Sequence, residues 1–282
     1  MPDTGPVPTV AEYRTIWISD IHLGAKGCQA TLLLDFLRAT ESANLYLVGD
    51  IVDGWRLRRW WYWPQTHNDV VQKLLRKARK GAKVVYIPGN HDAFARKYAG
   101  YQFGGIEVLK EAIHETADGR RLLVLHGDEF DVVVRYARWV ALLGDWAYHA
   151  ALRLNVLVNW SRQVLGLPYW SLSAYLKLKV KRAMQFVGAY ESAVAHAARQ
   201  RGVDGVVCGH IHHAEMREIE GVLYCNDGDW METCSALVER HDGSLEILRW
   251  SDIAQTQRKA STPVRAPGRR RAAPALPGFR RA

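Results

Sequence analysis

The sequence predicts an α/β fold, and three observations support this prediction. Short apolar runs alternate with stretches whose apolar residues have helical spacing. The early runs end in Gly, Asp, Asn or His, and ligand sites of α/β folds are expected where strands end. After a long helical region, strand-like runs return with turns such as Asp242-Gly243, which suggests a second sheet. A chain of 282 residues is long enough for one large domain or two modest ones.

The elements are assigned along the chain from this pattern. Residues 1–12 carry three prolines and are expected to be a flexible lead-in to a domain at 13–250. Helices are expected around Leu32–Leu37 and from Asn68 to Lys80, where Gly81 ends the pattern. The runs expected to be strands are Thr15–Ile18, Leu45–Val48, Val84–Ile87, Ile106–Leu109, Arg121–Leu125, Val206–Cys208, Val222–Cys225, Cys234–Val238 and Leu245–Trp250.

Two regions depart from this alternation. Residues 131–201 have helical periodicity and are too long for a connection, so we expect a helical insertion that caps the site. Residues 251–282 hold eight Lys and Arg against one Asp, and should form a disordered basic tail. The tail therefore carries most of the net charge of +9. Contact with an anionic membrane or nucleic acid, or simple solvation, would each explain it.

The cysteines and the apolar runs bear on the compartment. Cys28, Cys208, Cys225 and Cys234 form no CxxC pair, so reduced core cysteines and a reducing compartment are expected. The first dozen residues lack a signal-peptide pattern. Charged residues interrupt the longest apolar region, 139–160, which disfavours a spanning helix. We expect a cytoplasmic protein that rests on the inner membrane.

The candidate chemistry lies in five motifs at predicted strand ends. A strand that ends at Gly49-Asp50 delivers a carboxylate to the carboxyl edge of a sheet, where it can bridge two divalent metals. The other four motifs are Asp20-Ile21-His22, Asn90-His91-Asp92, His126-Gly127-Asp128 and His210-Ile211-His212. Carboxylate and amide oxygens with imidazole nitrogens suit Mn, Fe or Zn. Any one motif is also typical of a cap or a satisfied polar residue, so the prediction depends on the ordered set.

The set D-x-H, GD-x-x-D, GNHD, HGD and GH-x-H resembles that of the calcineurin-like metallophosphoesterase superfamily over roughly residues 14–250. The resemblance implies a four-layer α-β-β-α sandwich of two mixed sheets and two divalent metals, Mn²⁺ first, with Fe or Zn as alternatives. It implies that His91 stabilises the phosphoryl transition state or protonates the leaving group, with Asp92 orienting it and Asn90 also contacting substrate. The implied ligands are Asp20, His22, Asp50 and His212 for one metal, and Asp50, Asn90, His126 and His210 for the other.

Within that superfamily, three features resemble the UDP-2,3-diacylglucosamine hydrolases of lipid A synthesis. They are the sequence of residues 18–24, the insertion after His126-Gly127-Asp128, and Gly228-Asp229-Trp230. The resemblance implies hydrolysis of a pyrophosphate to UMP and 2,3-diacylglucosamine 1-phosphate, so the expected partner is a nucleotide-linked lipid. Better-known members carry Arg at the position of His91 and GHTH-Arg at 209–213, so their arginine contact with phosphate is absent here.

Two basic stretches bear on the substrate. Residues 56–63 join bases to indoles, which favours docking at a membrane surface, although packing of the tryptophans under the cap explains the stretch equally well. In the insertion, Lys177, Lys179, Lys181 and Arg182 alternate with apolar residues. Lys179 and Arg182 are the expected substrate contacts, with a solvated helix face as the alternative.

Other functions fit the sequence less well. A nuclease or a cyclic-nucleotide phosphodiesterase could use the same metals, but little basic charge lies outside the tail, so nucleic acid is not the expected partner. A protein phosphatase is disfavoured because Gly54-Trp55 follows Asp53 where that family has Arg-Gly. A non-catalytic scaffold is disfavoured because every expected ligand position is filled and His91 is present.

Overall fold

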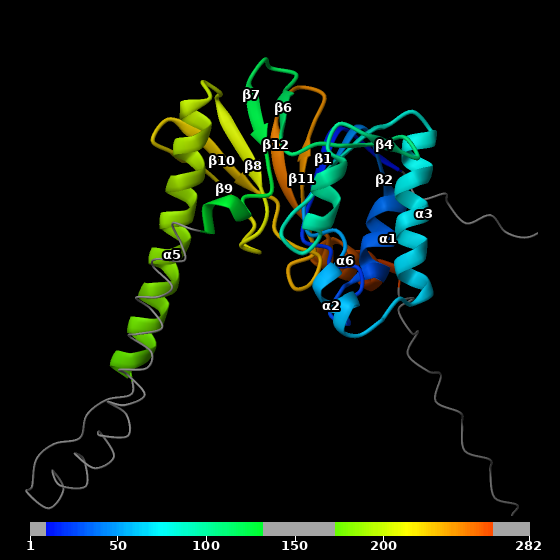
Figure 1. Cartoon of the computed structure of the whole chain (residues 1–282), viewed down its shortest axis with the longest axis horizontal. Coiled ribbons are helices and arrows are strands. Elements are labelled where there is room, and N and C mark those ends of the chain that lie inside the picture. The colour runs from blue at the N-terminus through cyan, green and yellow to red at the C-terminus, as the bar shows by residue number, and fades with distance from the viewer. Residues whose placement is uncertain (1–9, 132–172, 262–282) are drawn as a thin grey trace, which may run out of the picture.

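The two sheets of the protein lie face to face with helices on their outer faces, in a four-layer α-β-β-α arrangement (Figure 1). The computed structural model describes residues 10–131 and 173–261, without the side chains of residues 173–186 and 257–261. The four-layer arrangement of two sheets and flanking helices confirms the predicted fold class.

The first sheet has seven strands in the order β12-β11-β1-β2-β3-β5-β4. Its parallel centre consists of β1 (Ala11–Ile18), β2 (Thr40–Val48), β3 (Lys83–Ile87) and β5 (Ile106–Val108). The outer strands β4 (Gln102–Phe103), β11 (Ser235–Glu239) and β12 (Leu245–Arg249) run antiparallel to their neighbours. The central strands are buried on both faces, as a sheet between two layers requires.

The second sheet has five strands in the order β6-β7-β8-β10-β9. Here β7 (Arg121–Val124), β8 (Gly205–Cys208) and β10 (Val222–Asn226) are parallel, and β6 (Ala112–Glu115) and β9 (Glu215–Ile219) flank them antiparallel. Both sheets are therefore mixed.

Three apolar layers hold the sandwich together. Trp17, Tyr46, Leu122 and Val207 are among the side chains buried between the sheets. The outer face of the first sheet packs against α1 (Ala30–Ala39), α3 (Gln65–Arg79) and α6 (Trp250–Ser261). The outer face of the second sheet packs against the last turns of α5 (Ser173–Gln200). Short helices lie near the strand ends: α2 (Gly54–Arg59), and the 3₁₀ turns η1 (Ala93–Tyr98) and η2 (Asp128–Phe130).

Three expectations require correction. The tail was expected to lose structure from Ser251, but α6 continues to Ser261 and buries Trp250 and Ala254 against the first helical layer. The β11–β12 hairpin does not start a second sheet, because β11 pairs antiparallel with β1 in the first. The end of the expected cap also belongs to the sandwich, since Tyr190 and Val194 of α5 are buried against the second sheet. Residues 132–172 of the expected cap, residues 1–9 and residues 262–282 lie outside the described ranges.

Glu239 joins the two sheets at the end of the sandwich opposite the predicted motifs. Its buried carboxylate accepts hydrogen bonds from Thr15 Oγ1 (2.6 Å), Arg14 Nη1 (2.7 Å) and the Ala117 amide (2.7 Å), and His114 Nε2 lies 2.9 Å away. Burial alone would raise the pKa of Glu239, but His114 first, then Thr15 and the Ala117 amide, lower it to about 2.

Replacing Glu239 with Gln should destabilise the fold by roughly 3 kcal/mol near neutral pH. A depressed folded pKa contributes stability above the unfolded value of 4.5, and that contribution is lost as pH falls toward about 2. Urea unfolding of both proteins should therefore show a difference that shrinks by more than half at about pH 3. A difference that does not change with pH would show that the hydrogen bonds matter and the charge does not.

Candidate metal centre

The loops after the parallel strands are strained at the predicted ligands. A positive φ is costly for residues other than glycine and persists where the surrounding structure enforces it, which is common at functional sites. Only two other non-glycine residues of the described ranges share this conformation. The strained ligands are Asp20 (φ 50°), His22 (φ 53°), Asp50 (φ 53°), His210 (φ 72°) and His212 (φ 54°).

Asp92 fixes the loop that carries Asp50. Its fully buried carboxylate accepts hydrogen bonds from the amides of Gly89 (2.6 Å), Ile51 (2.7 Å) and Val52 (3.2 Å). The His91 amide then donates to Asp50 Oδ1 (2.8 Å). These bonds leave Asp50 Oδ2 directed at the imidazoles around it.

One group of donor atoms gathers around Asp20. Its Oδ1 atom lies 3.0 Å from His212 Nε2 and 3.8 Å from His22 Nε2. Asp20 Oδ1 and His22 Nε2 are both buried and make no hydrogen bond within the described chain. Buried donor atoms without hydrogen bonds are costly, and a divalent cation would satisfy them.

A second group gathers around Asp50, whose Oδ2 atom lies 3.5 Å from His126 Nε2 and 3.9 Å from both His22 Nε2 and His91 Nε2. Asp50 belongs to two of the three donor clusters of the described residues that are compact enough for a metal. Gly89 packs against Asp50 and must be a glycine, because a Cβ at Gly89 would lie 2.3 Å from Asp50 Oδ1. The arrangement fits a carboxylate that bridges two ions.

The remaining predicted ligands surround His126. The Val48 carbonyl lies 2.9 Å from His126 Nδ1, which must therefore carry a proton, so Nε2 is the ring nitrogen that could bind a metal. Asn90 Oδ1 lies 3.3 Å from that Nε2. The ring of His210 is 5.1 Å from the ring of His126, and Asp131 Oδ1 holds its Nε2 at 2.6 Å.

Mutual attraction between the carboxylates and the imidazoles opposes the effect of burial on their pKa values. Burial alone would raise the pKa of Asp20, but the nearby imidazoles of His212, 3.0 Å away, and His126 hold it well below its usual range. Burial would lower the pKa of His126, yet Asp50 and Asp20 raise it to about 10. Carboxylate oxygens and imidazole nitrogens gathered in a buried site are donors that a pair of divalent cations would bind.

His91 is oriented by Asp53 rather than by Asp92, and the expectation for Asp92 was wrong. Asp53 Oδ1 lies 3.0 Å from His91 Nδ1, and Asp53 Oδ2 lies 3.5 Å from His22 Nδ1. The carboxylate of Asp92 is instead occupied by backbone amides. Asp53 and Asp131 are the two residues that the sequence left without a role, although Asp53 ends the GD-x-x-D motif.

Replacing Asp53 with Asn should lower kcat by about 10–100-fold at saturating metal, because a charge behind His91 and His22 is lost. Asparagine preserves the α2 cap, in which Asp53 Oδ1 accepts from the Arg56 amide (2.9 Å), so the fold should be retained. Steady-state kinetics checks the loss, with Asp69→Asn on α3 as the matched control. Equal activity of both variants would show that Asp53 has no role in the reaction.

The two expected substrate contacts of the insertion are not tested. Lys179 and Arg182 belong to α5, and their side chains lie outside the described part of the structure. The described helices include none that is long and apolar enough to span a bilayer.

Sequence comparisons agree with the site. The calcineurin-like phosphoesterase family matches residues 13–214. The chain is similar to the UDP-2,3-diacylglucosamine hydrolase of Psychromonas ingrahamii, with 26% identity over 252 residues that span 84% of this chain and 97% of the relative. It is also similar to the UDP-2,3-diacylglucosamine hydrolase of Escherichia coli K12, with 25% identity over 227 residues that span 73% of this chain and 84% of the relative.

Solved structures are more distant. An archaeal phosphodiesterase aligns with a TM-score of 0.40 and 11% identity, over 83% of this chain and 98% of its own. Vps29 of Entamoeba histolytica in complex with zinc aligns with a TM-score of 0.39 and 15% identity, over 83% of this chain and 97% of its own.

Proposed function

Because this chain belongs to the calcineurin-like phosphoesterase family, we propose that its metal-dependent phosphoesterase site hydrolyses the pyrophosphate bond of UDP-2,3-diacylglucosamine. The products are UMP and 2,3-diacylglucosamine 1-phosphate. The substrate is supported by relatives with that name, which align over most of this chain. The observation that carries the chemistry is the convergence of buried, unpaired donor atoms beside His91.

We propose Mn²⁺ as the metal. Asp20, His22 and His212 would hold one ion, Asn90, His126 and His210 the other, and Asp50 both. When bound, such a pair supplies an acidified water and positive charge next to the phosphoryl oxygens.

The protein's own residues orient the reaction. Asp53 accepts the Nδ1 proton of His91, so Nε2 is directed toward the Asp50 side of the site. His91 is partly exposed and can contact a substrate phosphoryl group. Asp131 holds Nε2 of His210, which leaves the other nitrogen of that ring for the metal. We further propose that residues 131–201 include a cap over this site and that the enzyme works at a membrane surface.

The test is release of UMP from UDP-2,3-diacylglucosamine by purified protein with Mn²⁺ in detergent micelles. UMP that appears with metal and disappears with a chelator supports the proposal. Hydrolysis of bis(p-nitrophenyl) phosphate without any UMP from the lipid would keep the phosphoesterase and overturn the substrate.

A further inference from the structure

We propose that α2 and the loop Trp60–Trp63 form a docking element that rests on an anionic lipid bilayer and delivers the lipid substrate to the metal centre. The inference rests on the proposed lipid substrate, since a diacyl lipid resides in a bilayer. It concerns a surface of the protein that contains none of the predicted metal ligands.

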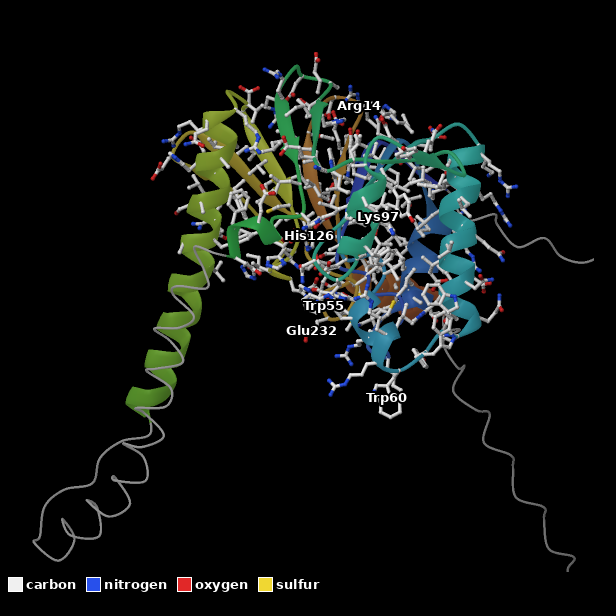
Figure 2. All side chains as sticks on the ribbon, in the orientation of Figure 1. Arg14, Trp55, Trp60, Lys97, His126 and Glu232 are labelled. Carbon is white, nitrogen blue, oxygen red and sulfur yellow. The ribbon has the colours of Figure 1, made fainter. Side chains whose placement is uncertain are left out.

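The element exposes large aromatic side chains at its outer end. Trp60 is 79% exposed and Trp61 78%, and none of the α2 side chains is buried. Trp60 projects from the edge of the molecule, whereas Trp55 lies nearer to His126 (Figure 2). Neighbouring exposed indoles are costly in water and are favoured at the interface of a bilayer. The exposure of these tryptophans fits the interpretation that they dock at a membrane.

The base of the element packs against the rest of the protein. Trp63 packs against the first helical layer and meets the ring of His67 edge-on at 5.6 Å. Tyr62 meets the same ring at 5.7 Å, and Trp61 stacks on Trp63 at 6.3 Å. The exposed indoles therefore extend from an ordered support, and little conformational entropy is lost when they enter an interface.

The charge of the element matches an anionic surface. Arg56, Arg58 and Arg59 are all exposed. Arg58 and Arg59 have no salt bridge within the described chain, so their charges are available to lipid headgroups.

A cavity leads from this element to the catalytic side. It has a volume of about 1000 Å³, and His91 and Trp55 line its inner end. Arg56, Arg59, Trp60 and Lys26 line it as well, and no carboxylate is among its described lining residues. Trp55 packs on His91 at 4.1 Å between ring centroids. An anionic lipid that leaves the bilayer beside Trp60 would meet bases and indoles up to His91.

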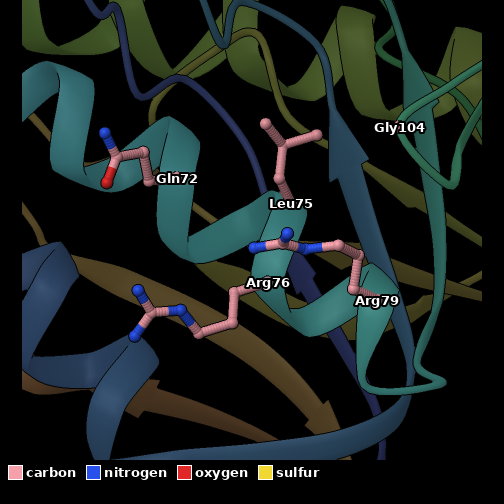
Figure 3. Close-up of a pocket in the computed structure, with 5 residues that line it drawn as sticks. All are labelled: Gln72, Leu75, Arg76, Arg79 and Gly104. Carbon is pink, nitrogen blue, oxygen red and sulfur yellow. The ribbon is translucent and has the colours of Figure 1, made fainter.

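The chain offers matched controls elsewhere. A second hollow of about 280 Å³ on the flank of α3 is lined by Arg76 and Arg79 together with Gln72, Leu75 and Gly104 (Figure 3). Arg76 and Arg79 are exposed bases like Arg58 and Arg59. Tyr101 and Phe103, which are 65% and 53% exposed, are aromatic controls away from α2.

The experiment measures co-sedimentation of the full chain, without substrate, with vesicles of phosphatidylcholine alone or mixed with phosphatidylglycerol. Wild type should bind the mixed vesicles, more weakly in high salt. Arg58→Glu with Arg59→Glu should weaken binding by more than about fivefold per residue. Trp60→Ala with Trp61→Ala should weaken it by at least about tenfold. Arg76→Glu with Arg79→Glu, and Tyr101→Ala with Phe103→Ala, should bind like wild type.

Two results would overturn the proposal. One is that the wild type fails to bind the mixed vesicles, or that all four double variants bind them as tightly as the wild type does. The other is α2 variants that keep vesicle binding but lose affinity for free UMP, which would make the cavity a nucleotide subsite. Vesicle binding needs no turnover, so a failure of the proposed hydrolysis would appear only in the UMP assay.

Discussion

Replacing Asp50 with Asn should abolish hydrolysis and lower the amount of metal the protein binds. Asp50 is the only predicted ligand assigned to both metals, and the described clusters around it share its Oδ2 atom with His22, His91 and His126. Metal pairs contribute several kcal/mol to phosphoryl transfer, so a loss of at least about 10³-fold in kcat is expected. The measurements are UMP release and the Mn²⁺ stoichiometry of dialysed protein.

A control separates this effect from damage to the fold. Asp35→Asn, on α1, removes a carboxylate that is paired only at the surface with Arg38 (3.9 Å). It should keep both activity and metal. Asp50→Asn should still unfold cooperatively, because backbone amides donate to Asp92 the hydrogen bonds that hold its loop. An Asp50→Asn variant that binds two Mn²⁺ and hydrolyses the lipid would refute the bridging role.

The central strands were predictable because a strand that is buried on both faces appears in the sequence as a continuous apolar run. The run Thr15–Ile18 is apolar and β-rich, and it ends where β1 ends. The edge strands β4, β6 and β9 were missed. Residues 215–219 are mostly exposed, so their strand is stabilised by pairing with β10 rather than by an apolar pattern.

The sheet assignment of the last strands was not predictable from local pattern. The β11–β12 hairpin would have the same local sequence pattern whether it extended the first sheet or started another. Its position is set by the pairing of Val238 with Ile16 and of Leu237 with Trp17, contacts that are distant in sequence. The start of the tail was misplaced for a related reason, since burial of Trp250 and Ala254 against the helical layer organises residues that are otherwise polar.

The candidate ligands were predictable because each follows a buried strand directly. The hydrogen-bond partners of the site residues were not predictable. His91 adjoins Asp92 in sequence, yet Asp92 is held by amides of the loop after β2, and the carboxylate at His91 comes from Asp53. That carboxylate also begins α2 by accepting from the Arg56 amide. A single buried side chain thus links the metal centre, the proton position on His91 and the start of the proposed docking element.

Replacing His91 should separate two roles that the site allows. His91→Ala is expected to lower kcat by about 10²–10⁴-fold without changing the Mn²⁺ stoichiometry. The His91 backbone amide, which positions Asp50, survives the change. A matching fall in metal binding would instead identify Nε2, which lies 3.9 Å from Asp50 Oδ2, as a ligand.

His91→Arg then distinguishes charge from proton transfer. The carboxylate of Asp53 lies 3.0 Å from Nδ1 and could pair with a guanidinium at this position, and a departing phosphate group needs little help from an acid. Arginine provides a permanent positive charge but cannot donate a proton to the leaving group at neutral pH. We therefore expect His91→Arg to retain kcat to within about tenfold of wild type, since a charge beside the phosphoryl group is what the transition state requires. An arginine variant as slow as His91→Ala, in a protein that keeps its metal, would show that the imidazole acts by proton transfer.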